Sequence, residues 1–181
     1  MATGLKAEID GFCLYLDQER NVSAHTLAAY RRDLEQFAEY AHREDGAGIC
    51  AASVTHILLR RYLAHLSKGM KKSSIGRKLA AIRSFFGFLL RRGVLTTNPA
   101  ELISTPKREK RLPFHLNIDQ VTSLVEAPSD GEKHALRDRA ILETLYSSGL
   151  RVSELTGLNI GDLDLTGGMV RAMGKGGKER I

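Results

Sequence analysis

The chain has 181 residues, of which 43% are apolar and 27% charged, and its formal net charge is +6. Enough apolar residues are present to form a packed core, which excludes a largely disordered protein. The apolar runs are too short for a membrane span, and Lys6, Glu8 and Asp10 exclude a signal peptide. Since Cys13 and Cys50 lack the spacing of metal ligands, we expect reduced thiols in a cytoplasmic protein.

Positive charge is concentrated in the middle third of the chain. Residues 54–112 hold 14 basic and 2 acidic residues, whereas residues 1–53 carry a net charge of −4 and residues 113–181 one of −2. Such a concentrated positive field suits a polyanion such as DNA. A solvated basic surface without a partner would show the same count, so charge alone leaves both interpretations open.

Helical spacing of apolar residues predicts three helices in the first seventy residues. The first covers residues 5–18, with its apolar residues on one stripe. The second opens at Ser23, whose hydroxyl is a good N-cap. The third covers residues 55–66.

A fourth helix is predicted to open at Ser73 or Ser74 and to end near Gly93. Its apolar residues follow steps of three and four, which is typical of a buried stripe. The members of this stripe are Ile75, Leu79, Ile82, Phe86 and Leu89.

The composition then changes at a proline-rich stretch. Pro99, Pro106 and Pro113 fall within fifteen residues of one another, so we expect a linker at residues 94–115 between domains 1–93 and 116–181. After it we expect three shorter helices and then strands that begin after Asp162. The helices are predicted at residues 117–124, 133–146 and 151–158.

The polar faces of the second and fourth helices are candidate phosphate-binding surfaces. A helix N-terminus adds free amide donors and a partial positive charge, which favour an anion there. We therefore expect duplex DNA to bind mainly at residues 60–92, although a helical adaptor protein with a charged surface is the alternative. The side chains expected to contact DNA are Thr26, Tyr30, Arg31, Ser73, Ser74, Arg77, Lys78, Arg83 and Ser84.

Two basic residues of the second domain are candidate functional residues. Arg151 follows a glycine turn at the start of a short helix, where the helix dipole disfavours a cation. Either Glu154 pairs with it three residues on, or an anion binds its planar fork of donors. Lys175 lies in a glycine turn and is followed by Gly176, so it does not fit a nucleotide-binding phosphate loop.

Several stretches resemble the tyrosine site-specific recombinases, and most of all their Xer branch. They are SAHTLAAYRRDLEQF, SSIGRKLAAIRSFFGFLLRRG, LRDRAILETLYSSGLRVSELTGLNIGDLDL and GKGGKER. The resemblance implies a mainly α fold, with a four-helix SAM-like core-binding domain followed by the truncated start of an α+β catalytic domain. It covers essentially the whole chain.

The resemblance also implies the chemistry. A tyrosine would attack a DNA phosphodiester to form a 3′-phosphotyrosyl bond, with Arg151 as the first catalytic arginine and Lys175 as the lysine that protonates the 5′-oxygen. No metal or other cofactor would be needed. The family's His-x-x-Arg motif, its later His or Trp and its nucleophilic tyrosine have no match, so we expect a fragment that cannot cleave DNA.

The resemblance leaves the biological role open. A Xer-like enzyme would act on chromosome dimers as a tetramer on DNA, with a second recombinase as a possible partner, whereas the fragment would be a monomer. A phage or transposon integrase, or a non-catalytic DNA-binding protein of the same fold, shares the motifs.

Overall fold

The computed structural model describes residues 4–46, 48–105, 107, 112–129, 131–174 and 179–180. These residues belong to two compact units, residues 1–110 and residues 111–181. The first unit contains α1 (Leu5–Gln18), α2 (Ala24–Asp45), the 3₁₀ helix η1 (Ala51–Ser53), α3 (His56–Ser67) and α4 (Lys72–Arg91). The mainly helical fold predicted from the sequence is confirmed.

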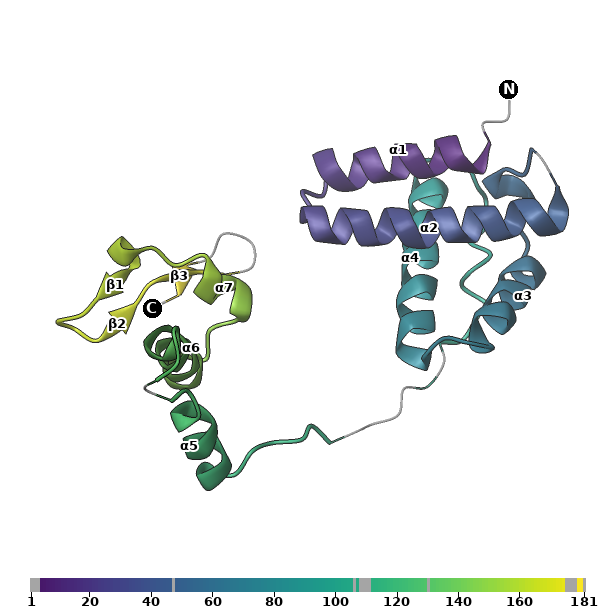
Figure 1. Ribbon diagram of the computed structural model, residues 1–181. Coiled ribbons are helices and arrows are strands. Elements are labelled where there is room, and N and C mark those ends of the chain that lie inside the picture. Colours follow the sequence, from purple (N-terminus) through teal and green to yellow (C-terminus); the bar gives the residue numbers. More distant parts are fainter. Residues whose placement is uncertain are drawn as a thin grey trace. The chain divides into compact units, whose positions relative to one another are not determined.

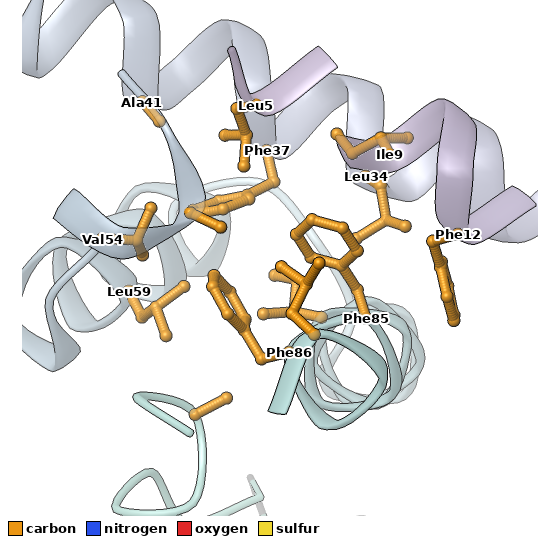
Figure 2. Close-up of a cluster of buried hydrophobic side chains, with 14 of the residues drawn as sticks. Leu5, Ile9, Phe12, Leu34, Phe37, Ala41, Val54, Leu59, Phe85 and Phe86 are labelled. Atoms are coloured by element: carbon orange, nitrogen blue, oxygen red, sulfur yellow. The ribbon is translucent and has the colours of Figure 1, made fainter. Parts of the chain in front are cut away.

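The core of the first unit lies between α4 and the other three long helices. Helix α1 packs along α2, and α4 crosses them at a steep angle (Figure 1). Aromatic rings fill the centre of the core, and Phe86 of α4 packs against Phe37 of α2 there (Figure 2). The centroids of these two rings are 6.4 Å apart. Phe12, Phe37, Phe85 and Phe86 are fully buried. Burial of this apolar surface is the main source of stability for the first unit.

In the first unit, α1 and α2 start where the sequence predicts, α3 starts one residue later than predicted, and α4 starts earlier than predicted. Ser23 and Thr55 are N-caps, and each side chain accepts a hydrogen bond from the backbone at 3.3 Å. Helix α4 begins at Lys72, so the predicted start at Ser73 or Ser74 is wrong by one or two residues. The extended residue Lys71 is the cap, and its carbonyl accepts the first backbone hydrogen bonds of the helix.

A segment beyond α4 folds back onto the first unit. Gly93 ends the helix with a φ of 71°, which favours glycine. Ala100 and Ile103 of this segment are buried, with exposed fractions of 0% and 5%, and both belong to the hydrophobic core. The prolines did not predict this packing. Their positions indicate where helices end, and they carry no information about where the following loop packs.

The second unit contains three helices followed by two short hairpins. They are α5 (Ile118–Glu126), α6 (Ala135–Ser148), α7 (Val152–Thr156), the 3₁₀ helix η2 (Ile160–Asp162), β1 (Leu163–Asp164), β2 (Met169–Val170), β3 (Ala172–Met173) and β4 (Glu179–Arg180). Gly149 ends α6 in the left-handed conformation, and α6 begins and ends two residues later than the predicted range 133–146. Asn117 caps α5 and accepts a hydrogen bond from the Gln120 amide at 2.8 Å.

The strands form two separate antiparallel pairs. Leu163 pairs with Val170 in the first, and Ala172 pairs with Arg180 in the second. Leu165, expected in a strand, lies in the turn between β1 and β2. Helix α7, which follows Arg151, packs against β3.

The second unit buries little apolar surface among its described residues. Ala135 and Ala172 are its buried apolar side chains. Larger ones are exposed, including Leu136 at 80%, Ile160 at 89% and Leu165 at 89%. Its helices and hairpins therefore have far less core to stabilise them than those of the first unit.

Candidate functional site

The start of α4 presents two of the predicted DNA-binding side chains to solvent. Ser73 is exposed, and the side chain of Arg77, one turn further on, is 52% exposed. Ser73 and Arg77 are four residues apart, so they lie on the same face of the helix. Ser74 is half-buried.

Lys78 is not on this exposed face. Its side chain is 2% exposed, and its ammonium Nζ lies 2.9 Å from Oδ1 of Asp33 on α2. The prediction that Lys78 lies off the apolar stripe is wrong. The reason is visible in the helical spacing, because Lys78 comes three residues after Ile75 and four before Ile82, both of which are buried.

Asp33 is a buried carboxylate that binds two cations. Its Oδ1 accepts from Lys78, and its Oδ2 accepts from Nη1 of Arg77. Gln36, one turn along α2, accepts a second hydrogen bond from Lys78. A buried charge is costly unless it is paired, and this network provides the pairing for both Asp33 and Lys78.

Nearby Tyr62 is buried with its hydroxyl unpaired among the described residues. Burial, together with the negative charges of Asp33 and Glu39, raises the pKa of its phenol above the ordinary value. The ring packs against Phe37 and Tyr40 at centroid distances of 5.3 and 5.1 Å. We therefore assign Tyr62 to the core.

The three predicted residues of α2 are all half-buried. Tyr30 is half-buried, with its ring 6.0 Å from that of Phe12. Thr26 is half-buried, and its hydroxyl lies 2.9 Å from that of Ser23. Arg31 donates to Asp10 of α1 at 2.6 Å, and this hydrogen bond raises the pKa of the guanidinium.

Arg83 lies on α4 but binds the loop that follows the helix. Its guanidinium donates to the carbonyls of Ala100 and Ile103 and, at 2.8 Å, to the hydroxyl of Thr105. Ser84, beside it, is half-buried. Of the predicted residues on α4, Ser73 and Arg77 are thus exposed and Ser74 and Ser84 are half-buried. Lys78 is buried against Asp33, and Arg83 is bound to the following loop.

Arg151 is the N-cap residue of α7 and is bound by Glu154. The backbone amide of Arg151 donates to Oε2 of Glu154 at 2.8 Å, and its Nη1 donates to Oε1 at 2.6 Å. The Glu154 side chain is 4% exposed, whereas that of Arg151 is 62% exposed. The carboxylate binds Nη1 of the guanidinium, and the Arg151 side chain stays mostly exposed among the described residues, so an anion can bind its other donors.

Lys175, the other predicted catalytic residue, lies outside the described residues. No group of three His, Cys, Asp or Glu side chains suited to a metal ion occurs in the part of the chain that the structure describes. Of the helices that the structure describes, none is long and apolar enough to cross a membrane.

Sequence reasoning missed the role of Asp33 and Gln36. The sequence did contain a usable signal. Lys78 lies at a position of the apolar stripe of its helix, and Asp33 lies next to the buried Leu34. A charged side chain at such a buried position needs a partner. What the sequence did not contain was the pairing of the two helices in space.

Comparison with known families matches nearly all of the chain in two parts. Residues 9–93 match the phage integrase N-terminal SAM-like domain, and residues 115–181 match the phage integrase family. The first match corresponds to the helical first unit, and the second includes Arg151.

Curated relatives named "Tyrosine recombinase XerC" match along the whole chain. One from Pelobacter propionicus is 65% identical over 177 residues, which are 98% of this chain and 59% of the relative. One from Pelotomaculum thermopropionicum is 43% identical, covering 96% of this chain and 58% of the relative. The chain thus spans less than two thirds of the length of these relatives.

Solved structures share the fold at low sequence identity. A lambda integrase tetramer bound to a Holliday junction has a TM-score of 0.76 and 19% identity, covering 99% of this chain and 50% of that one. A Tn1549 transposon integrase in complex with a circular intermediate DNA has a TM-score of 0.67 and 18% identity, covering 90% and 50%. With both family matches and the XerC relatives, we conclude that the chain belongs to the Xer-like tyrosine recombinases of the phage integrase family.

Proposed function

We propose that the first unit binds duplex DNA along residues 60–92, with the start of α4 against the phosphate backbone. The support is the net charge of +12 in residues 54–112 together with the exposed Ser73 and Arg77. Arg60, Lys68 and Arg91 add exposed positive charge on α3, α4 and the turn between them. The lambda integrase of similar fold was solved on DNA, which agrees with this assignment.

We further propose that Arg151 and Lys175 act on the scissile phosphate of a site-specific recombination reaction. In that reaction a tyrosine attacks the phosphorus, a 3′-phosphotyrosyl bond forms, and the 5′-oxygen leaves as a hydroxyl. The observation that carries the proposal is the exposed guanidinium of Arg151, fixed at one end by the buried Glu154. Such a preoriented donor stabilises charge that develops on the non-bridging oxygens.

The biological role that we favour is resolution of chromosome dimers by a tetramer on DNA, with a second recombinase as partner. The support is the high identity to relatives named XerC, compared with 18–19% identity to lambda integrase. We expect this chain alone to be a monomer without DNA and inactive in strand cleavage. The cytoplasm, where the thiols Cys13 and Cys50 stay reduced, suits this role.

A phage or transposon integrase is the second candidate, because the proteins of similar fold include the lambda and Tn1549 integrases. Recombination assays of the full-length protein on chromosomal dimer sites and on phage or transposon ends would separate these roles.

The DNA-binding proposal is tested by the salt dependence of affinity. If about six phosphates are contacted, the logarithm of the association constant should fall with the logarithm of salt concentration at a slope near −5. Arg77→Ala should make the slope about one unit shallower. Arg43→Ala is the matched control, since Arg43 is an exposed arginine at the opposite end of α2 from Ser23. A slope near zero for the unaltered chain would rule the proposal out.

A further inference from the structure

The buried network beneath the start of α4 has an unbalanced charge. Asp33 is 1% exposed and carries one negative charge, which it shares between the ammonium of Lys78 and the guanidinium of Arg77. Lys78 is 2% exposed, and among the described residues its one further partner is Gln36. One carboxylate therefore serves two cations, and the network keeps a net charge of +1.

Of the two cations, only Arg77 can offer that charge to a ligand. The ammonium of Lys78 is enclosed, whereas the side chain of Arg77 is 52% exposed. Only Nη1 of Arg77 is bound to Asp33, and its remaining N–H donors have no partner among the described residues. A guanidinium with one fixed nitrogen and free donors is preoriented for a second oxyanion.

The surroundings of Arg77 indicate which anion fits. Ser73, one turn earlier on the same face, adds an exposed hydroxyl, and the first amides of α4 add further donors. Exposed Lys68 and Lys71 precede the helix. This cluster of donors and positive charge suits a phosphodiester oxygen of a DNA backbone.

We propose that Asp33 is a positioning residue for DNA binding: one of its carboxylate oxygens fixes Arg77 for a backbone phosphate, while the other is bound by Lys78 in the core. This inference rests on the proposed binding of DNA at α4. It predicts that replacing the buried Asp33–Lys78 pair weakens DNA binding although the net charge of the chain stays the same.

The test uses variants that change positioning without changing net charge. In Asp33→Asn/Lys78→Met the buried pair is replaced by neutral side chains of similar size, a replacement that folded proteins usually tolerate. Arg77 then loses its anchor and must be ordered when DNA binds. We expect affinity for duplex DNA at fixed salt to fall about two- to tenfold. Arg77→Ala should cost less in this background than in the unaltered chain, because the two changes affect one interaction.

Glu44→Gln is the matched control. It removes a carboxylate of the same helix that pairs with Arg61 at the surface, with 30% and 54% of the two side chains exposed. We expect this variant to bind DNA as tightly as the unaltered chain or more tightly. Circular dichroism and thermal unfolding of each variant establish that the helical unit is folded before affinities are compared.

The outcomes separate the inference from the function on which it rests. If the unaltered chain shows no salt-dependent binding to duplex DNA, the proposed function fails. If it binds and the folded Asp33→Asn/Lys78→Met variant binds equally well, the positioning role is overturned while DNA binding stands. The same holds if Arg77→Ala binds as tightly as the unaltered chain.

Discussion

At the scale of single residues, the clearest feature is that two of the candidate arginines, Arg77 and Arg151, are each bound by a carboxylate that is itself buried. Glu154 fixes Arg151, and Asp33 fixes Arg77. Both arginine side chains remain more than half exposed. An arginine that is anchored in this way loses less conformational entropy when it binds a phosphate than a free surface side chain does.

The proposed roles of Arg151 and Lys175 predict different responses to a changed leaving group. In the full-length protein, Ala at either position should slow cleavage by roughly 10²-fold or more. A substrate with a 5′-bridging sulfur leaves as a thiolate and needs no proton. It should restore cleavage by Lys175→Ala and leave Arg151→Ala defective, as measured by covalent adduct on denaturing gels. Equal rescue of both variants would contradict this division of roles.

Tyr62 gives a prediction about stability. Its buried hydroxyl has no hydrogen-bond partner among the described residues. Folding therefore removes the hydroxyl's hydrogen bonds to water without replacing them, whereas the ring contributes favourable packing. Tyr62→Phe should therefore raise the free energy of unfolding, or leave it unchanged within about 0.5 kcal/mol. Denaturant unfolding monitored by circular dichroism measures it. A loss of more than about 1 kcal/mol would show that the hydroxyl has a partner.

At the scale of elements, α4 is the helix around which the first unit is organised. Its apolar stripe enters the core, its first turns carry Ser73 and Arg77, and Arg83 in its middle binds the returning loop. The loop also buries Ala100 and Ile103. One helix therefore links the core, the candidate phosphate contacts and the segment that leaves the unit.

Loss of Arg83 should release this loop without unfolding the helix. In Arg83→Ala the carbonyls of Ala100 and Ile103 lose their donor, so we expect faster amide hydrogen exchange at residues 100–105. Exchange within α1 and α2 should change little. Arg91→Ala, which alters an exposed arginine of the same helix, is the control. Unchanged exchange at residues 100–105 would show that apolar packing alone fixes the loop.

At the scale of the whole molecule, the two units differ sharply in how much core they have. The first buries a contiguous cluster of aromatic and aliphatic side chains, whereas the second leaves residues such as Leu136, Ile160 and Leu165 exposed. Since burial of apolar surface is the main favourable contribution to folding, the units should differ in stability.

Hydrogen exchange of this chain should therefore be strongly unequal between the units. We expect amides of α1, α2 and α4 to be protected for much longer than those of α5, α6 and α7. A single cooperative unfolding transition with equal protection in both units would contradict this prediction. Two separate transitions in thermal unfolding would support it.

The sequence by itself determined most of the helices, because helical spacing and capping are local. Residues 5–18 were predicted with the observed bounds, and Ser23 is the N-cap of α2 as expected. The start of α4 was misplaced because its cap is the backbone of Lys71 and not a serine side chain. Arg151 was also identified as a candidate site residue from the sequence.

Only the tertiary structure decided how the charged residues are used. Lys78 and Asp33 are 45 residues apart, and they meet because α2 and α4 pack together. Arg83 similarly binds a loop about twenty residues further on. A basic residue adds the same charge to a sequence count whether it faces solvent or a buried carboxylate. Its exposure is set by packing between segments that are distant in the sequence. Composition therefore indicated a basic region, while packing determined which of its side chains are free to bind a phosphate.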